Sequence, residues 1–187
     1  SGVSKIFARF EVGRKYAIIG KSGSGKSTLL NVILGLVQAD LGSIEGMPDR
    51  VGTVFQEDRL CEDFTVKTAI KMVMDKVSLE RSGFSDVDDY IADLLERLEL
   101  KGFSEKKISD LSGGEKRRVA VARMIAYFPK VYVLDEALKG LDRHTKHTVM
   151  DVLQEETEGK TVIAVTHDRD ELKFWNGKVI EVNKYNG

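Results

Sequence analysis

Three observations predict an α/β fold, in which helices cover both faces of a mainly parallel sheet. Short, uniformly apolar runs alternate with segments of helical periodicity, a pattern typical of strands that are buried on both faces. A glycine-rich loop joins one of these runs to a helical segment. A stretch of helical periodicity from residue 65 to about residue 103 interrupts the alternation, and we interpret it as an inserted helical subdomain.

Length and composition exclude several classes of protein. A chain of 187 residues is long enough for one domain with a sizeable core. Charged residues make up 32% of the chain, but the formal net charge is −1, which argues against a dedicated nucleic-acid binder because such proteins are usually basic. The single cysteine, Cys61, excludes an internal disulfide and fits a reducing compartment.

Membrane insertion is not expected from this sequence. It has no apolar run of about 18 residues, the length that a spanning helix needs. The first fifteen residues carry charges throughout, which is unlike a signal peptide. If the protein works at a membrane, we expect another chain to supply the membrane part.

Four strands are predicted before the helical insert. Residues 5–12 alternate between apolar and polar side chains, and residues 16–19 are uniformly apolar. Residues 42–46 have turn signals at both ends, which is typical of a short strand. A further apolar run predicts a strand over residues 51–55, which ends at Gln56.

The insert is predicted to contain two amphipathic helical stretches separated by a loop at residues 81–85. Thr65 is the expected N-cap of the first stretch and Asp86 that of the second. Each stretch carries apolar residues at helical spacing, which places them on one face. These residues are Val66, Ile70, Val73 and Val77 in the first stretch, and Val87, Tyr90, Ile91, Leu94, Leu95 and Leu98 in the second.

The alternation of strands and helices resumes after the insert. Apolar runs predict strands over residues 131–134, 162–165 and 178–182. Helical periodicity predicts helices over residues 115–127 and 143–157. The order of these elements supports a parallel sheet with helical connections.

The loop between the strand at residues 16–19 and the following helix has the pattern of a phosphate-binding loop. Its glycines let backbone N–H groups curl around an anion, and the helix N-terminus adds a partial positive charge. Lys26 can reach the β- and γ-phosphates of a nucleotide, and the Ser27 hydroxyl can bind Mg²⁺. A flexible linker is disfavoured, because a linker would not lie between two apolar elements with a lysine in register. The loop consists of Gly20, Lys21, Ser22, Gly23, Ser24, Gly25, Lys26, Ser27 and Thr28.

Four predicted strands end in polar residues. In an open α/β sheet the ligand lies beyond the carboxyl ends of the strands, so these residues are expected to converge on one pocket. They are the phosphate loop, Gln56, the pair Asp135 and Glu136, and the pair Thr166 and His167. Convergence favours a functional His167 over an ordinary histidine in a solvated loop.

The two adjacent carboxylates have different expected roles. A carboxylate that ends a strand beside a phosphate loop typically holds Mg²⁺, which we assign to Asp135. The next carboxylate, Glu136, can orient or deprotonate a water that attacks the γ-phosphate. The alternative for Glu136 is a plain surface carboxylate, which the buried character of the preceding strand disfavours.

Leu111, Ser112, Gly113, Gly114 and Glu115 precede another helix and offer a second set of backbone N–H groups with a serine hydroxyl. This half-site has no lysine of its own, so it needs a second ligand or a second copy of the chain. Two chains arranged head to tail about a two-fold axis would place it over the partner's nucleotide. The alternative is a plain helix start with a Gly-Gly loop, and spacing alone leaves both interpretations open.

In these motifs the chain resembles the ATPase subunits of ABC transporters, from about Lys5 to the tail. The motifs occur in the order that the family has. They are the Walker A loop at residues 20–28, the Q-loop at Gln56, the signature motif at residues 111–115, Walker B at residues 131–135 with the catalytic Glu136, the D-loop at residues 138–142 and the switch His167.

The resemblance implies a P-loop NTPase with an ABC ATPase fold, which binds ATP and Mg²⁺. In this fold the mainly parallel sheet has an antiparallel β edge, and a helical subdomain is inserted. Residues 1–64 and 111–187 would form the ATP-binding core, and residues 65–110 the helical subdomain. The catalytic residues would be Glu136, His167 and Gln56, and the metal ligands Ser27, Gln56 and Asp135. ATP would contact the Walker A loop and, from the partner protomer, Ser112, Gly113, Gly114 and Asp142.

The resemblance also implies partners and a location. The chain would form an ATP-dependent head-to-tail homodimer, or pair with a similar ATPase, on the cytoplasmic face of the cell membrane. Its further partners would be transmembrane permease subunits, with a coupling helix received near residues 56–64, and a substrate-binding protein; nucleic acid is not expected. Residues 54–60 and 139–142 are similar to those of bacterial importers of nitrate, sulfonates or taurine.

Three other functions compete with this interpretation: the ATPase subunit of an exporter, a non-transport ATPase of the same class, and a nucleotide sensor with little turnover. The chain also departs from the family pattern in places. Ala137 replaces a usual proline and Glu115 a common glutamine. The aromatic residue that stacks on adenine in the family is expected to fall before Ser1.

Overall fold

The computed structural model describes residues 8–182. Contacts within the chain divide it into two compact units, which we call the sheet unit and the helical unit. The sheet unit is Ser1–Thr53 with Lys130–Glu136 and Gly159–Gly187, and the helical unit is Val54–Pro129 with Ala137–Glu158. The division proposed from the sequence, at residues 65 and 110, stays a prediction.

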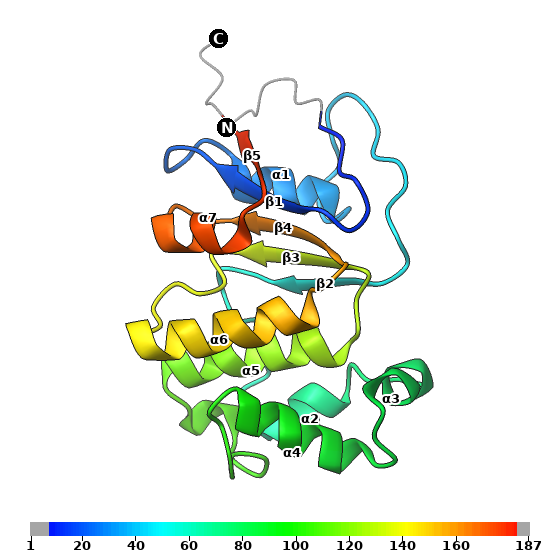
Figure 1. Cartoon of the computed structure of the whole chain (residues 1–187), viewed down its shortest axis with the longest axis vertical. Helices are drawn as coiled ribbons and strands as arrows, with labels where there is room; N and C mark the ends of the chain where they lie inside the picture. The colour runs from blue at the N-terminus through cyan, green and yellow to red at the C-terminus, as the bar shows by residue number, and fades with distance from the viewer. Residues whose placement is uncertain (1–7, 183–187) are drawn as a thin grey trace. The chain divides into compact units, whose positions relative to one another are not determined.

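Within residues 8–182 the sheet has five strands, in the order β2-β3-β4-β1-β5 (Figure 1). The pairs β1–β4, β1–β5 and β3–β4 are parallel, as predicted. Because β1, β3 and β4 are parallel neighbours, their carboxyl ends lie at one edge of the sheet. The strands are β1 (Lys15–Ile19), β2 (Val51–Val54), β3 (Val131–Asp135), β4 (Thr161–Val165) and β5 (Lys178–Glu181).

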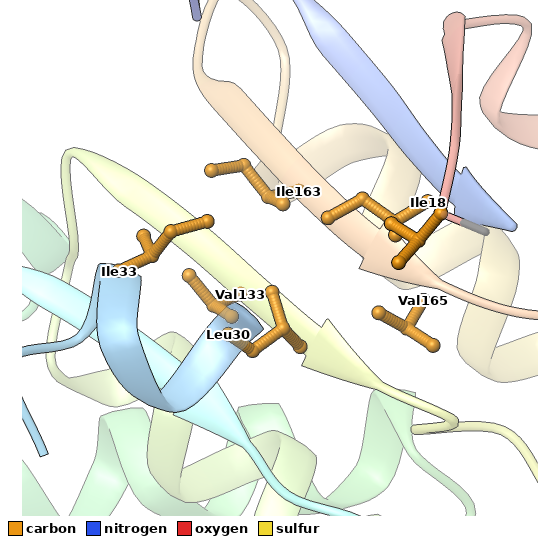
Figure 2. Packing of buried hydrophobic residues seen from close by; sticks show 7 residues of the cluster. Ile18, Leu30, Ile33, Val133, Ile163 and Val165 are labelled. Carbon is orange, nitrogen blue, oxygen red and sulfur yellow. The ribbon is translucent and has the colours of Figure 1, made fainter. Parts of the chain in front are cut away.

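Helix α1 (Lys26–Ile33) packs its apolar face on this sheet. Leu30 and Ile33 lie three residues apart, so they share one face of the helix. Figure 2 shows both side chains beside strand residues of the same core. The buried cluster consists of Ile18, Leu30, Ile33, Val133, Ile163, Val165 and Val182.

The helical unit contains two helices whose N-caps agree with the prediction. The Thr65 hydroxyl accepts a hydrogen bond from Thr68 N at 3.1 Å, and the Asp86 carboxylate accepts one from Asp88 N at 2.7 Å. These caps begin α2 (Val66–Lys71) and α4 (Val87–Arg97). The unit also contains α3 (Lys76–Ser82), the 3₁₀ helix η1 (Ile108–Asp110), α5 (Gly113–Ala126) and α6 (Arg143–Glu156).

The first helical stretch of the insert is shorter than expected. The apolar spacing predicted one face from Val66 to Val77, but α2 ends at Lys71 and a new helix begins at Lys76. Asp75 causes the restart, because its carboxylate accepts hydrogen bonds from the backbone N–H and the hydroxyl of Ser78, each at 2.8 Å. A local cap therefore overrides the periodic pattern.

Residues 42–46 form no strand, which corrects the sequence prediction. Gly42 and Gly46 adopt left-handed conformations, and Ile44 is 45% exposed, so the segment buries no face against a neighbour. The first expected strand is also missing from residues 8–12, while residues 5–7 lie outside the described residues. In the described part of the chain, β1 pairs in parallel with both β4 and β5. Residues 8–12 and 42–46 therefore supply no antiparallel edge to the sheet.

Helix α7 (Arg169–Trp175) was not predicted from the sequence. Asp168 caps it by accepting hydrogen bonds from Asp170 N at 2.8 Å and Glu171 N at 3.4 Å. Trp175 is buried at its end. No helix among residues 8–182 is both long enough and apolar enough to cross a membrane.

Leu30→Ala tests the packing of α1 on the sheet. Leu30 is 2% exposed within the core cluster, so truncation leaves a cavity and should lower the free energy of unfolding by about 2–5 kcal/mol. Leu36→Ala is the control, because Leu36 is 56% exposed and its truncation should cost less than about 0.5 kcal/mol. Urea denaturation measures both, and equal losses would contradict the packing described above.

Candidate functional site

The phosphate loop connects β1 to α1 and depends on glycine at its first position. Gly20 has φ +155°, and a Cβ added there would overlap Val182 O and Ser24 Oγ. Gly25 precedes α1 with φ 94° and provides no side-chain cap for the helix. The first N–H groups of α1 therefore have no side-chain acceptor in the loop, which is the arrangement that suits a bound anion.

Lys26 folds back over the loop. Its Nζ donates hydrogen bonds to Gly20 O at 2.9 Å and to Lys21 O at 3.0 Å. Ser24 is buried, and its hydroxyl has no hydrogen-bond partner among the described residues. The side chains of Ser27 and Thr28 are exposed on the first turn of α1. A cation, a hydroxyl and free N–H groups thus gather at the carboxyl end of β1.

The two carboxylates lie at the end of β3, beside the end of the neighbouring strand β4. Asp135 is the last residue of β3, is 5% exposed and pairs in register with Val165 of β4. Glu136 N donates a hydrogen bond to Val165 O at 2.9 Å. The sheet thus continues to the residue that follows the strand, and it fixes where the Glu136 side chain begins.

Glu136 and His167 are in contact, as the convergence of strand ends predicts. Glu136 Oε1 lies 3.2 Å from His167 Nδ1, and the direction of this hydrogen bond depends on the histidine tautomer. Glu136 has φ 49°, a left-handed conformation that is uncommon for a residue with a side chain. Such strain costs about 1–3 kcal/mol and is concentrated at functional sites.

The signature segment is a helix start with a capping box. The Ser112 hydroxyl accepts a hydrogen bond from Glu115 N at 3.3 Å, and Glu115 Oε2 accepts one from Ser112 N at 2.7 Å. Gly113 and Gly114 are the first residues of α5, so they do not form the loop that one interpretation expected. The proposed contact with a partner's nucleotide stays a prediction.

Asp142 is the N-cap of α6. Its Oδ1 accepts a hydrogen bond from Thr145 N at 3.1 Å, and its Oδ2 accepts one from Thr145 Oγ1 at 2.6 Å. These bonds stabilise the carboxylate and lower the pKa of Asp142. Asp142 therefore has a structural role within its own chain, beside the contact across a dimer that the resemblance implies.

The predicted site residues divide between the two units. The phosphate loop, Asp135, Glu136 and His167 belong to the sheet unit. Gln56, the signature residues Ser112–Gly114 and Asp142 belong to the helical unit. The first group is brought to one edge by the parallel strands. The second group is positioned by α5 and α6.

Sequence reasoning missed Arg117, which binds the backbone of the Gln56 segment. Its guanidinium donates hydrogen bonds to Phe55 O at 2.6 Å and to Gln56 O. These acceptors are 62 and 61 residues away along the chain, so no local pattern could indicate the contact. The sequence gives no signal that singles out Arg117, because it stands between Lys116 and Arg118 in a run of charged residues.

The sequence matches a family profile described as ABC transporter over residues 3–139. Aliphatic sulfonates import ATP-binding protein SsuB 2 of Pseudomonas syringae pv. tomato is 35% identical over 176 residues, which cover 91% of this chain and 71% of that protein. SsuB 1 of Pseudomonas syringae pv. syringae is 36% identical over 174 residues, which cover 90% of this chain and 68% of that protein.

Solved structures agree with this family. The dimeric ATP-binding cassette MJ0796, in a post-hydrolysis state bound to ADP and Pi, aligns with a TM-score of 0.76 at 30% identity, covering 94% of this chain and 84% of that chain. Another dimeric structure of MJ0796, a bacterial ABC transporter cassette, aligns with a TM-score of 0.77 at 30% identity, covering 94% and 83%. The predicted fold class is confirmed by these similarities.

The capping box at α5 predicts a dependence of stability on pH. Hydrogen bonds from the Ser112 backbone and side chain lower the pKa of Glu115 from its ordinary value of 4.5. A carboxylate with a lowered pKa stabilises the fold above the ordinary value, and this contribution is lost as the pH falls through the folded value. Glu115→Gln keeps an acceptor but does not titrate, so its unfolding free energy should fall less steeply in acid.

Urea denaturation of both proteins from about pH 7 to about pH 3 measures the difference. Glu80→Gln removes an exposed carboxylate of α3 and serves as the control. If the free energy of unfolding falls equally with decreasing pH in the native chain and in Glu115→Gln, the capping box does not stabilise the folded state.

Proposed function

Because the chain belongs to the ABC transporter family and is an ATP-binding ATPase subunit, we propose that it drives the import of a small anion across a membrane. One observation supports the residue roles most strongly. The strained Glu136 and its partner His167 follow β3 and β4, beside the strand that leads into the phosphate loop. This arrangement suits the hydrolysis of a nucleoside triphosphate.

The donor set at the strand ends fits Mg-ATP. Magnesium in phosphate sites is usually held by one or two carboxylates together with the phosphates, and not by a cage of protein ligands. The described residues contain no cluster of three or more histidine, cysteine or acidic side chains that could hold a metal, which agrees with that pattern. Asp135 and Ser27 would hold the ion, with Gln56 as a further ligand, and the ion would neutralise phosphate charge.

The residues of the chain then have distinct tasks. Lys26 and the N–H groups of the phosphate loop bind the phosphates. Glu136 orients the attacking water and accepts its proton, and the contact with His167 holds the carboxylate in place. His167 contacts the γ-phosphate. We propose that the uncommon backbone conformation of Glu136 aims its carboxylate at that water.

A second protomer completes the site in this proposal. In the closed dimer the Ser112 hydroxyl would donate to a phosphate oxygen of the partner's ATP in place of the Glu115 carboxylate, which is its partner within its own chain. A Cβ added at Gly113 would meet no described atom within 4 Å, so packing inside this chain does not require glycine there. Close approach of a second molecule would require it.

ATP would favour the closed dimer because it contacts both protomers only in that state. Hydrolysis removes the bridge, and the dimer reopens. Asp142 would contact the partner protomer, and Gln56 would relay the change to permease subunits at the inner face of the membrane. A substrate-binding protein would deliver the cargo.

Aliphatic sulfonates are the proposed class of cargo. Two relatives with 35% and 36% identity are named as ATP-binding proteins for their import. These names favour import over export and over a function outside transport. The permease and the substrate-binding protein would contact the cargo, and this chain would not.

The Glu136→Gln variant tests the composite site. Replacing the carboxylate by an amide removes the general base, so turnover should fall by roughly 10²–10⁴-fold while ATP still binds. The molecular mass in solution, measured with and without Mg-ATP, should change from monomer to dimer only when Mg-ATP is present. Adding Ser112→Arg to this variant should abolish the dimer, and a normal ATP-dependent dimer in that double variant would refute the shared site.

Lys26→Ala tests the phosphate loop. The variant loses the cation that lies over Gly20 and Lys21, so the affinity for ATP should fall by about tenfold or more. Lys160→Ala removes an exposed lysine of the sheet unit and should bind ATP like the native chain. Equilibrium binding of a fluorescent ATP analogue measures both, and an unchanged affinity for Lys26→Ala would contradict the role of this loop.

A further inference from the structure

The segment at residues 55–62, which contains Gln56, has no helix or strand of its own. It follows β2 directly, and Arg59 within it has the left-handed φ of 47°. An irregular segment of this kind needs partners for its backbone carbonyl groups. Basic side chains of α5 provide several of them.

Arg117 makes the central contacts. Its side chain is 9% exposed, and it donates to Phe55 O at 2.6 Å and to Gln56 O. It also forms an ion pair with Asp58 Oδ1 at 3.1 Å. One guanidinium therefore holds two successive carbonyl groups and a carboxylate of the same segment.

Neighbouring basic residues of α5 hold the outer parts of the segment. Lys116 Nζ donates to Glu62 Oε1 at 2.7 Å, and Arg123 donates to Arg59 O at 3.1 Å. These two residues lie on either side of Arg117 along the helix. The contacts run along the segment from Phe55 to Glu62, and Arg117 is the member that reaches Gln56 itself.

The chemistry of the central contact requires arginine. A guanidinium presents five N–H donors in a planar fork, so it can bind two carbonyl groups and a carboxylate at once. A lysine ammonium carries the same charge but cannot reproduce this fork. The partly buried carboxylate of Asp58 forms the ion pair with this guanidinium. Burial raises the pKa of Asp58, and the positive charge of Arg117 opposes that rise.

We propose that Arg117 is a positioning residue that sets the backbone of Gln56 from the helix that begins at the signature motif. The inference rests on the proposed function, in which Gln56 acts at the metal and Ser112 to Gly114 contact the partner's ATP. Arg117 lies five residues after Ser112 on α5. The contact of Arg117 with Gln56 and the proposed contact of Ser112 with the partner's ATP would therefore move together. Arg117 acts through Gln56 and does not touch ATP.

The effect of Arg117→Lys should therefore be specific. ATP is bound by the phosphate loop of the sheet unit, so its affinity should stay within about twofold. The turnover number should fall by about tenfold, because hydrogen bonds to a charged group are lost and Gln56 is no longer held. The Mg²⁺ concentration for half-maximal activity should rise by a similar factor.

The chain offers a natural probe for the position of the segment. Cys61 is its single cysteine, is exposed and lies within residues 55–62. A nitroxide spin label on Cys61 should become more mobile in Arg117→Lys, without any nucleotide present. Arg81→Lys is the matched control, because its guanidinium binds one backbone carbonyl, Phe128 O, outside the segment.

A double-mutant cycle separates positioning from general stability. If Arg117 acts through Gln56, Arg117→Lys should lower the turnover number of the native chain about tenfold but leave that of Gln56→Ala nearly unchanged. Equal losses in both backgrounds would overturn the proposal, as would an unchanged label mobility in Arg117→Lys. A native chain that does not hydrolyse ATP would instead contradict the proposed function, and with it the role of Gln56.

Asp58→Asn provides a second route if Arg117→Lys does not fold. It removes the ion pair that orients the guanidinium and keeps both carbonyl acceptors. Label mobility at Cys61 should rise in this variant, by less than in Arg117→Lys. A label as immobile as in the native chain would count against Arg117 as the residue that holds the segment.

Discussion

The parallel pairing of β1, β4 and β3 is the constraint on which the candidate site depends. Parallel neighbours end at the same edge of a sheet, so the residues that follow each strand meet there without any further device. The phosphate loop follows β1, His167 lies two residues after β4, and Glu136 follows β3. The hydrogen bond from Glu136 N to Val165 O extends this pairing into the site itself.

Burial and charge then distinguish the members of the site. Asp135 is buried at the end of its strand, whereas Glu136 is reached by the exposed His167. Lys26 lies over the loop carbonyl groups after β1, which β4 separates from β3 in the sheet. Cation and carboxylates therefore occupy separate strand ends, which is the separation that a triphosphate with its metal ion requires.

Local patterns predicted much of this arrangement. Uniform apolar runs located the strands, and Thr65 and Asp86 located two helix starts, because these signals are contained within a few residues. The signals for the Asp75 cap and for helix α7 are equally local. Apolar spacing that continues across Asp75 hid the cap, and the short length of α7 hid that helix. The left-handed φ of Glu136 could not be predicted, because no glycine or turn signal marks this position in the sequence.

Helix α5 shows why the remaining contacts escape sequence reasoning. Its start is fixed by Ser112 and Glu115 within one turn, a pattern visible in the sequence. Arg117 binds carbonyl groups about sixty residues earlier, where any residue type would offer the same acceptor. A helix rises about 1.5 Å per residue and is stiff over one or two turns. The cap and the arginine lie five residues apart on this helix, so in the proposed mechanism a displacement of Ser112 would be passed through Arg117 to the Gln56 backbone.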